Sequence, residues 1–166
     1  MDPRAEAEFA EFMNGRWSAL VRLGYGLTGD QGLAEDLAQT ALARAYASWP
    51  RVRRAGDPDA YVRRIMLNAN HSRFRKRRVR EELTGRPPET GAPEAGTPDD
   101  RPALMAALMR LPAGQRAAVV LRYWMDMTET EAAATLGCSV GNVKSQAARA
   151  LAKLRVSEDL AEGRRP

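Results

Sequence analysis

Side chains that can bond the bases and phosphates of nucleic acids gather in the last third of this 166-residue chain. Amide, ammonium, hydroxyl and guanidinium groups match the donors and acceptors that base edges present in the major groove of DNA. An ordinary solvated helix face carries the same residue types, so their surroundings must distinguish the two interpretations. The residues concerned are Asn142, Lys144, Ser145, Gln146 and Arg149.

The residues around this group predict two short helices joined by a tight turn. Thr128, with Glu131 three residues later, is a capping-box pattern that starts a helix, and Gly137 is suited to end it. Ser139 can cap a second helix whose apolar residues recur at helical spacing. The polar group faces away from this buried stripe, as in a helix-turn-helix that presents its second helix to DNA. We therefore predict DNA reading. The stripe consists of Val140, Val143, Ala147, Leu151 and Leu154.

Charge is distributed in blocks along the chain, whose formal net charge is +5. Residues 51–80 carry eleven basic and two acidic side chains, whereas residues 81–100 carry one basic and six acidic ones. The remainder, from residue 101 onward, is again basic. Two cationic blocks on either side of an acidic stretch favour a polyanionic partner, bound through contacts that weaken with salt.

Composition limits the fold and the function further. Only 6% of the residues are aromatic and β-branched runs are scarce, so an all-α fold is expected. No apolar run approaches the roughly 20 residues of a membrane span, and the single cysteine, Cys138, allows no internal disulfide. These features predict a cytoplasmic protein without membrane insertion. No catalytic or metal-ligand constellation and no phosphate-binding loop is recognisable, so we expect no enzyme activity, no metal and no cofactor.

The chain is expected to form two small helical domains, over residues 1–80 and 103–156. Glycine and proline supply eight of the 22 residues from 81 to 102, which predicts a flexible linker able to extend to about 70 Å. A polar tail is expected over 157–166. Tryptophans are expected to anchor the core or an interface, at Trp17, Trp49 and Trp124.

Helix boundaries can be predicted in both domains. In the first domain, helices are expected over 6–27, from Asp30 to Trp49 and from Asp57 to Arg78. Pro50 is expected to end the second of these, and 51–56 to form a basic loop. In the second domain, four helices are expected over 103–110, 113–125, 129–136 and 140–155.

Several segments, taken in order, resemble the extracytoplasmic-function sigma factors, the smallest class of bacterial sigma subunits of RNA polymerase. Residues 9–80 resemble sigma region 2, and residues 103–155 resemble region 4. The segments that carry the resemblance are Asp36-Leu37-Ala38-Gln39, Ala60-Tyr61-Val62-Arg63-Arg64, Leu111-Pro112-Ala113-Gly114-Gln115-Arg116 and Gly137-Cys138-Ser139-Val140-Gly141-Asn142-Val143-Lys144-Ser145.

The resemblance implies a protein that directs RNA polymerase to promoters and assists promoter melting. Region 2 would bind the clamp of the largest subunit through its second helix, with Asp36, Gln39 and Arg44 as candidate contacts. Region 4 would lie on the flap of the second-largest subunit and read the −35 element. An anti-sigma factor is a further partner that the resemblance allows, and the protein would join the nucleoid within the holoenzyme. The −35 candidates are Lys144 and Ser145, with Asn142, Gln146, Ala148 and Arg149 nearby.

The basic segment and the third helix would bind the −10 element. Melting requires a base to leave the stack and enter a pocket, and the separated strand needs positive charge and planar groups. Tyr61 can supply a ring, and Asn68 matches the pocket asparagine of the family. The arginines are expected to hold the DNA backbone without reading sequence. They form a track of Arg51, Arg53 and Arg54 and a phosphate-binding group of Arg73, Arg75, Arg77 and Arg78.

Two other functions remain open from the sequence. A free-standing helix-turn-helix regulator would need to dimerise for adequate specificity, and it leaves residues 1–80 unexplained. A basic RNA- or membrane-surface adaptor would read no sequence, which the cap-turn-cap pattern disfavours. Co-purification with core polymerase excludes the regulator, and equal affinity for scrambled duplexes would support the adaptor.

Overall fold

The structure, a computed structural model, describes residues 1–85 and 101–161, and every element in these ranges is helical. The all-α prediction is therefore confirmed. The first half contains α1 (Pro3–Thr28), α2 (Gln31–Ala47), α3 (Trp49–Arg54) and α4 (Pro58–Thr84). The second half contains α5 (Arg101–Met109), α6 (Ala113–Val119), the π-helical segment η1 (Val120–Trp124), α7 (Glu129–Leu136) and α8 (Val140–Ala161).

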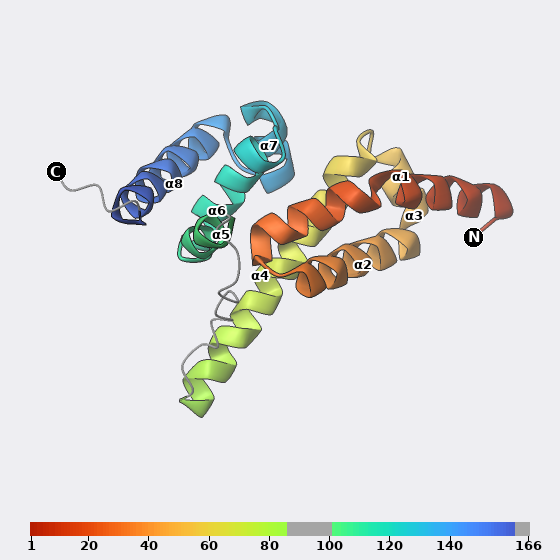
Figure 1. Ribbon diagram of the computed structural model, residues 1–166. Helices are drawn as coiled ribbons and strands as arrows, with labels where there is room; N and C mark the ends of the chain where they lie inside the picture. The colour runs from red at the N-terminus through yellow and green to blue at the C-terminus, as the bar shows by residue number, and fades with distance from the viewer. Residues whose placement is uncertain (86–100, 162–166) are drawn as a thin grey trace.

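In the first half, α1 and α2 form an antiparallel pair against which α4 packs (Figure 1). An aspartate caps each of these three helices by accepting from a backbone N–H three residues later; the longest of these bonds joins Ala60 N to Asp57 Oδ1 at 3.1 Å. Small residues bring α1 and α2 close together, because a Cβ added at Gly24 would lie 2.8 Å from the Ala34 Cα. Leu23 and Met66 are fully buried in the resulting core.

The prediction of a basic loop over residues 51–56 is wrong for most of the segment, because residues 51–54 are helical. The second helix ends at Ala47, and Trp49–Arg54 forms the separate helix α3 with Pro50 in its first turn. Proline is tolerated there because the N–H it lacks would have no helical partner. Trp49 and Val52 are buried and hold α3 against the core, which directs its arginines outward.

Two helices extend beyond their predicted ends. The four residues 81–84, expected to belong to the linker, form the last turn of α4, and Gly85 closes it in the left-handed conformation at φ 63°. Likewise, α8 continues over residues 157–161, where the tail was expected. Residues 101 and 102, also expected in the linker, form the start of α5. The remaining residues of the predicted linker (86–100) and of the tail (162–166) lie outside the described residues.

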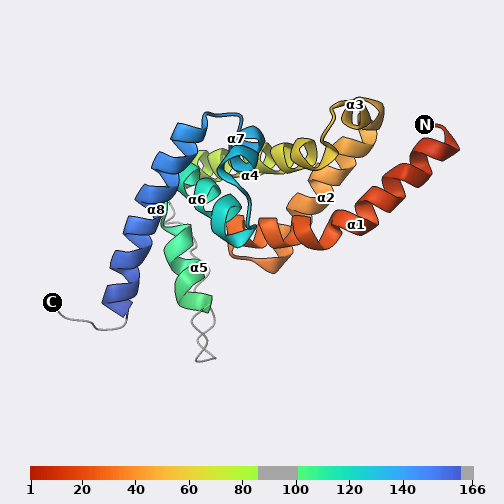
Figure 2. The same cartoon turned by 90° about the horizontal axis from the view of Figure 1, so that it is seen from above.

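The two halves pack together and share one hydrophobic core. In both views, α6 and the segment that follows it lie between α1 and α8 (Figure 1, Figure 2). Gly26 of α1 allows a close approach, since a Cβ added there would lie 2.9 Å from both Trp124 Cδ1 and Val120 Cγ1. Trp124 therefore anchors the interface between the halves, which is one of the two roles that the sequence predicts for the tryptophans.

Candidate nucleic-acid interface

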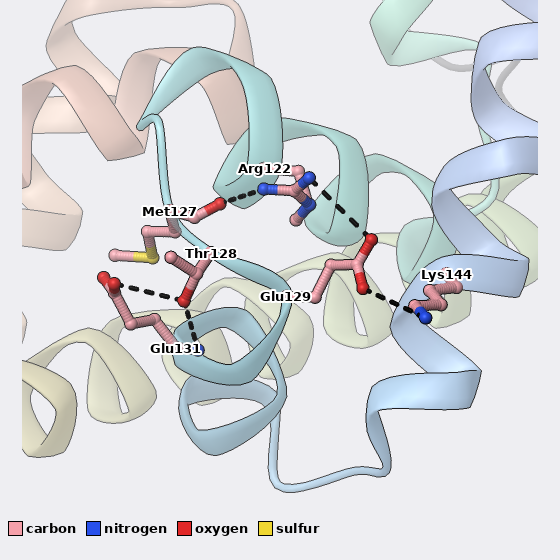
Figure 3. Close-up of polar contacts among 6 residues, drawn as sticks. All are labelled: Arg122, Met127, Thr128, Glu129, Glu131 and Lys144. Atoms are coloured by element: carbon pink, nitrogen blue, oxygen red, sulfur yellow. Dashed lines mark hydrogen bonds and ion pairs between the residues drawn. The ribbon is translucent and has the colours of Figure 1, made fainter.

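The helix-turn-helix forms with the caps that the sequence predicts. Thr128 Oγ1 accepts from the Glu131 backbone N–H at 3.1 Å, and the Thr128 hydroxyl lies 3.1 Å from Glu131 Oε1 (Figure 3). The Glu131 carboxylate thus accepts from the hydroxyl, whereas the capping-box pattern predicts a bond to the Thr128 backbone. Gly137 ends α7 at φ 69°, and its N–H donates to the Ala133 carbonyl at 2.8 Å. Ser139 Oγ accepts from the Asn142 N–H at 3.1 Å.

Helix α8 buries one face and exposes the other. Val143 and Ala147 of the predicted stripe are buried, and Ala150, which the stripe does not include, is fully buried. Gln146 is half-buried and lies beside α6, because a Cβ added at Gly114 would be 3.4 Å from its Nε2 atom. The remaining −35 candidates are exposed on α8: Asn142, Lys144, Ser145, Ala148 and Arg149.

The basic residues of α3 are exposed beside the N-terminal part of α1. Arg53 Nε lies 2.9 Å from Glu8 Oε2, so this arginine already has a carboxylate partner within the protein. Exposed ion pairs of this kind contribute only about 0–1 kcal/mol, and a phosphate can displace such a partner. Arg51 and Arg54 are also exposed.

The candidates on α4 do not all share one environment. Asn68 is exposed and Tyr61 is half-buried against the core. Further along the helix, Arg75, Arg77 and Arg78 are exposed, and Arg77 pairs with Glu81 at 3.1 Å.

Arg73 differs from the three arginines that follow it. Its side chain is half-buried, and Nη2 donates to Asn70 Oδ1 at 3.4 Å, while Nε is buried without a hydrogen-bond partner. Burial lowers the pKa of the Arg73 guanidinium, and the positive charge of Arg77 lowers it further. The Arg73 side chain is thus less accessible to solvent than those of Arg75, Arg77 and Arg78.

The polymerase candidates lie on the outer face of α2. Asp36, Gln39 and Arg44 are all exposed, whereas Leu37 and Ala41 between them are buried. The helix therefore presents these three polar groups to solvent, where a second protein can reach them.

Two arginines that sequence reasoning missed as contacts join the halves through helix C-termini. Arg64 of α4 donates from Nη2 to the Ala134 carbonyl at 2.9 Å and from Nε to the Thr135 carbonyl at 3.4 Å, near the end of α7. The last carbonyls of a helix lack intrahelical partners, and the negative end of the helix dipole favours a cation there.

Arg116 has the same role in a buried position. Its guanidinium donates to the Leu27 carbonyl at the end of α1, at 3.3 Å, and also to three carbonyls at or just after the end of α5. Burial lowers the pKa of Arg116, and the nearby positive charge of Arg73 adds to the effect. No sequence signal identifies such contacts, because any residue type supplies the carbonyl. The three acceptors are Leu108 and Met109 of α5 and Leu111 just after it, at 2.9, 2.8 and 2.9 Å.

Comparisons with known proteins identify the family. The model of sigma-70 region 2 matches residues 17–80, and that of sigma-70 region 4 matches residues 101–154. The chain is 43% identical over 157 residues to the RNA polymerase sigma-E factor of Streptomyces coelicolor, covering 92% of this chain and 89% of that protein. It is 34% identical over 139 residues to the ECF RNA polymerase sigma factor EcfG of Rhodopseudomonas palustris, covering 82% and 77%. The chain is an extracytoplasmic-function sigma factor.

The fold of this sigma factor is similar to solved structures of relatives. One is the sigma factor RpoE in complex with the anti-sigma factor NepR from Bartonella quintana, with a TM-score of 0.77 and 28% identity, covering 92% of this chain and 97% of that one. Another is CnrH in complex with the cytosolic domain of CnrY, with a TM-score of 0.66 and 27% identity, covering 93% and 90%.

Membership in the family determines the general function. The sigma factor directs RNA polymerase in transcription initiation and is not itself an enzyme. A free-standing helix-turn-helix regulator, the alternative left open by the sequence, does not account for the region 2 match over residues 17–80. Within the part of the chain that the structure describes, no three His, Cys, Asp or Glu side chains gather to hold a metal, and no helix is long and apolar enough to cross a bilayer.

Proposed function

We propose that the two halves of the sigma factor read two elements of one promoter. Helix α8 enters the major groove at the −35 element and presents Lys144 and Ser145 to base edges, while Asn142 and Arg149 contact bases or phosphates beside them. The observation that carries this proposal is the separation of faces on α8, where Val143 and Ala147 are buried and the polar candidates are exposed. Gln146 and Ala148 lie on the same helix as secondary contacts.

Helices α3 and α4 bind the −10 element in this proposal. An amide both donates and accepts, so exposed Asn68 suits a base held by its edge in a pocket. Tyr61 offers a ring on the same helix. The exposed arginines of α3 and of the later part of α4 provide positive charge for the DNA backbone. The arginines are Arg51, Arg53 and Arg54 of α3 and Arg75, Arg77 and Arg78 of α4. Arg73, being half-buried, orients Asn70 and contributes charge rather than direct phosphate contact.

The polymerase contacts belong to surfaces that these DNA contacts leave free. The outer face of α2, with Asp36, Gln39 and Arg44, binds the clamp of the largest subunit. The second half lies on the flap of the second-largest subunit. Core polymerase resides in the cytoplasm of bacteria, so the sigma factor works there and associates with the nucleoid as holoenzyme.

Reading both elements requires the halves to separate. One turn of B-DNA is about 34–36 Å, whereas Arg64 of α4 here donates directly to the last turn of α7. The compact arrangement therefore belongs to the sigma factor outside the promoter complex. A partner that holds it would block initiation. Of the structurally similar proteins, the sigma factor RpoE is seen bound to an anti-sigma factor and CnrH to the cytosolic domain of CnrY. We include an anti-sigma factor among the partners.

Co-purification tests the assembly. The full-length sigma factor, mixed with core RNA polymerase, is expected to elute with it and to protect two promoter segments in a footprint, one at each element. A protein that binds duplex DNA but never elutes with core polymerase would exclude the clamp and flap contacts. Protection at the −35 element alone would exclude the role of α3 and α4.

A further inference from the structure

Glu129 lies between two cations on the DNA-facing side of the second half. Its Oε1 atom is 3.9 Å from Arg122 Nη2, and its Oε2 atom is 3.5 Å from Lys144 Nζ. Figure 3 shows the carboxylate placed between the two side chains, each facing a different oxygen. As the first residue of α7, Glu129 also lies at the positive end of that helix, which favours its charge.

Arg122 fixes the carboxylate from the other side. It comes from the π-helical segment, its guanidinium donates to the Met127 carbonyl, and its side chain is only 23% exposed. The Glu129 side chain is 35% exposed and that of Lys144 is 62% exposed. The exposed fraction of the side chain therefore increases outward, from the partly buried Arg122 through Glu129 to Lys144, which α8 presents to DNA.

The pair changes what Lys144 can do at a DNA surface. A lysine ammonium has three donors on a long, freely rotating stem, and an unpaired one moves to the nearest phosphate. With one donor facing Glu129, two remain for the adjacent acceptors O6 and N7 of a guanine. The carboxylate also repels phosphates, so it disfavours the contact that carries no sequence information. Discrimination often arises from such a repulsive element.

We propose that Glu129 is a specificity-determining residue, which positions Lys144 for base reading and weakens sequence-independent binding of the second half to DNA. This inference rests on the proposed reading of the −35 element by α8. It adds a residue outside α8 that acts through Lys144. The ligand is duplex DNA with a guanine at the base pair that Lys144 reaches.

The matched pair of variants is Glu129→Gln and Glu131→Gln. Both remove one negative charge from the first turn of α7, but Glu131 contacts Thr128 and not Lys144. Glutamine can replace glutamate in a capping box, so the control should keep its fold. Thermal unfolding followed by circular dichroism checks that both variants are folded.

Holoenzyme made with each full-length variant is titrated against two labelled duplexes, the −35 sequence that wild-type holoenzyme selects from a random library and a scrambled version. Glu129→Gln should bind the scrambled duplex about two- to fivefold more tightly, the factor that corresponds to an exposed ion pair. Its preference for the selected sequence should fall by a similar factor. The affinity of Glu129→Gln for scrambled DNA should also fall more steeply with salt than that of the wild type, by the amount that corresponds to about one additional phosphate contact. Glu131→Gln should keep the wild-type preference.

The outcomes separate the two proposals. If wild-type holoenzyme selects no −35 sequence, the proposed function fails. If it does select one, but the two glutamine variants keep the same preference, only the role of Glu129 is refuted. Adding Glu129→Gln to Lys144→Ala provides a second test, because a residue acting through Lys144 should change the preference no further. An additional loss in that double variant would show that Glu129 acts independently and would overturn the proposal.

Discussion

Arg22 and Trp124 bond each other's backbone across the boundary between the two halves. The Trp124 indole N–H donates to the Arg22 carbonyl at 2.8 Å, and Arg22 Nη2 donates to the Trp124 carbonyl at 2.9 Å. The guanidinium also lies over the indole ring, 5.3 Å from its centroid. These contacts join α1 to the end of the π-helical segment, and none of them is an ion pair. Their strength therefore depends on how closely Trp124 packs against the neighbouring Gly26.

Gly26→Ala should weaken the packing of the halves. The added Cβ would lie 2.9 Å from Trp124 and Val120 side-chain atoms, and overpacking of this kind costs about 1–3 kcal/mol. Gly15→Ala in the same helix is the control, because no heavy atom lies within 4 Å of its Cβ position. The control should gain about 0.5–1 kcal/mol from helix propensity. Thermal unfolding and small-angle scattering measure stability and compactness. Equal stabilisation by both alanines would contradict the described interface.

Arg116→Lys should lower the free energy of unfolding by about 2–3 kcal/mol. The guanidinium satisfies four carbonyls from α1 and the α5 region, and a lysine ammonium cannot reproduce that fork, so buried acceptors lose their donors. Exposed Arg110→Lys should stay within about 0.5 kcal/mol of the wild type. Urea unfolding provides the measurement. A value for Arg116→Lys as small as that of the control would exclude the capping role.

Lys144→Ala should reduce the preference of the holoenzyme for its selected −35 sequence by about 1–3 kcal/mol. Competition between selected and scrambled duplexes measures this difference. The control is Lys153→Ala, which removes an exposed lysine further along α8. An equal loss of affinity for both duplexes with Lys144→Ala would identify a phosphate contact and not base reading.

Asn68→Ala should impair promoter opening and leave polymerase binding intact. Asn68 is exposed on α4, so its removal disturbs no buried contact. The loss of one hydrogen-bonding amide should lower the open fraction by about tenfold, or roughly 1.4 kcal/mol. Permanganate reactivity of promoter thymines measures opening, and native electrophoresis measures binding to core polymerase. Asn14→Ala, exposed on α1, is the control. Loss of both opening and binding would refute a local role for Asn68.

Local features were predictable from the sequence. The caps at Thr128, Gly137 and Ser139 depend on residues within three or four positions of each other, so the helix-turn-helix could be placed accurately. The outward position of Lys144 followed from helical spacing alone. At Pro50 the local rule was ambiguous, because proline both ends one helix and suits the first turn of the next. Burial of Trp49 and Val52, a tertiary effect, favoured the second outcome.

Contacts between the halves could not be predicted in this way. Arg64 and Ala134 are 70 residues apart, and the acceptor is a backbone carbonyl that every residue type has. Arg73 shows the converse, since its position in an arginine-rich run predicts exposure while packing leaves it half-buried. The pairing of Lys144 with Glu129 joins two helices, and spacing along one helix does not reveal it.

Transcription in vitro from a library of random promoters tests the central claim most directly. Core RNA polymerase is supplied with the full-length sigma factor, and the start sites of the transcripts are sequenced. We predict start sites preceded by two enriched elements at fixed spacing, with the upstream element lost when Lys144 is replaced by alanine and the downstream element weakened when Asn68 is. Transcripts without any shared upstream sequence, or a pattern identical to that of core polymerase alone, would contradict promoter reading by the two halves.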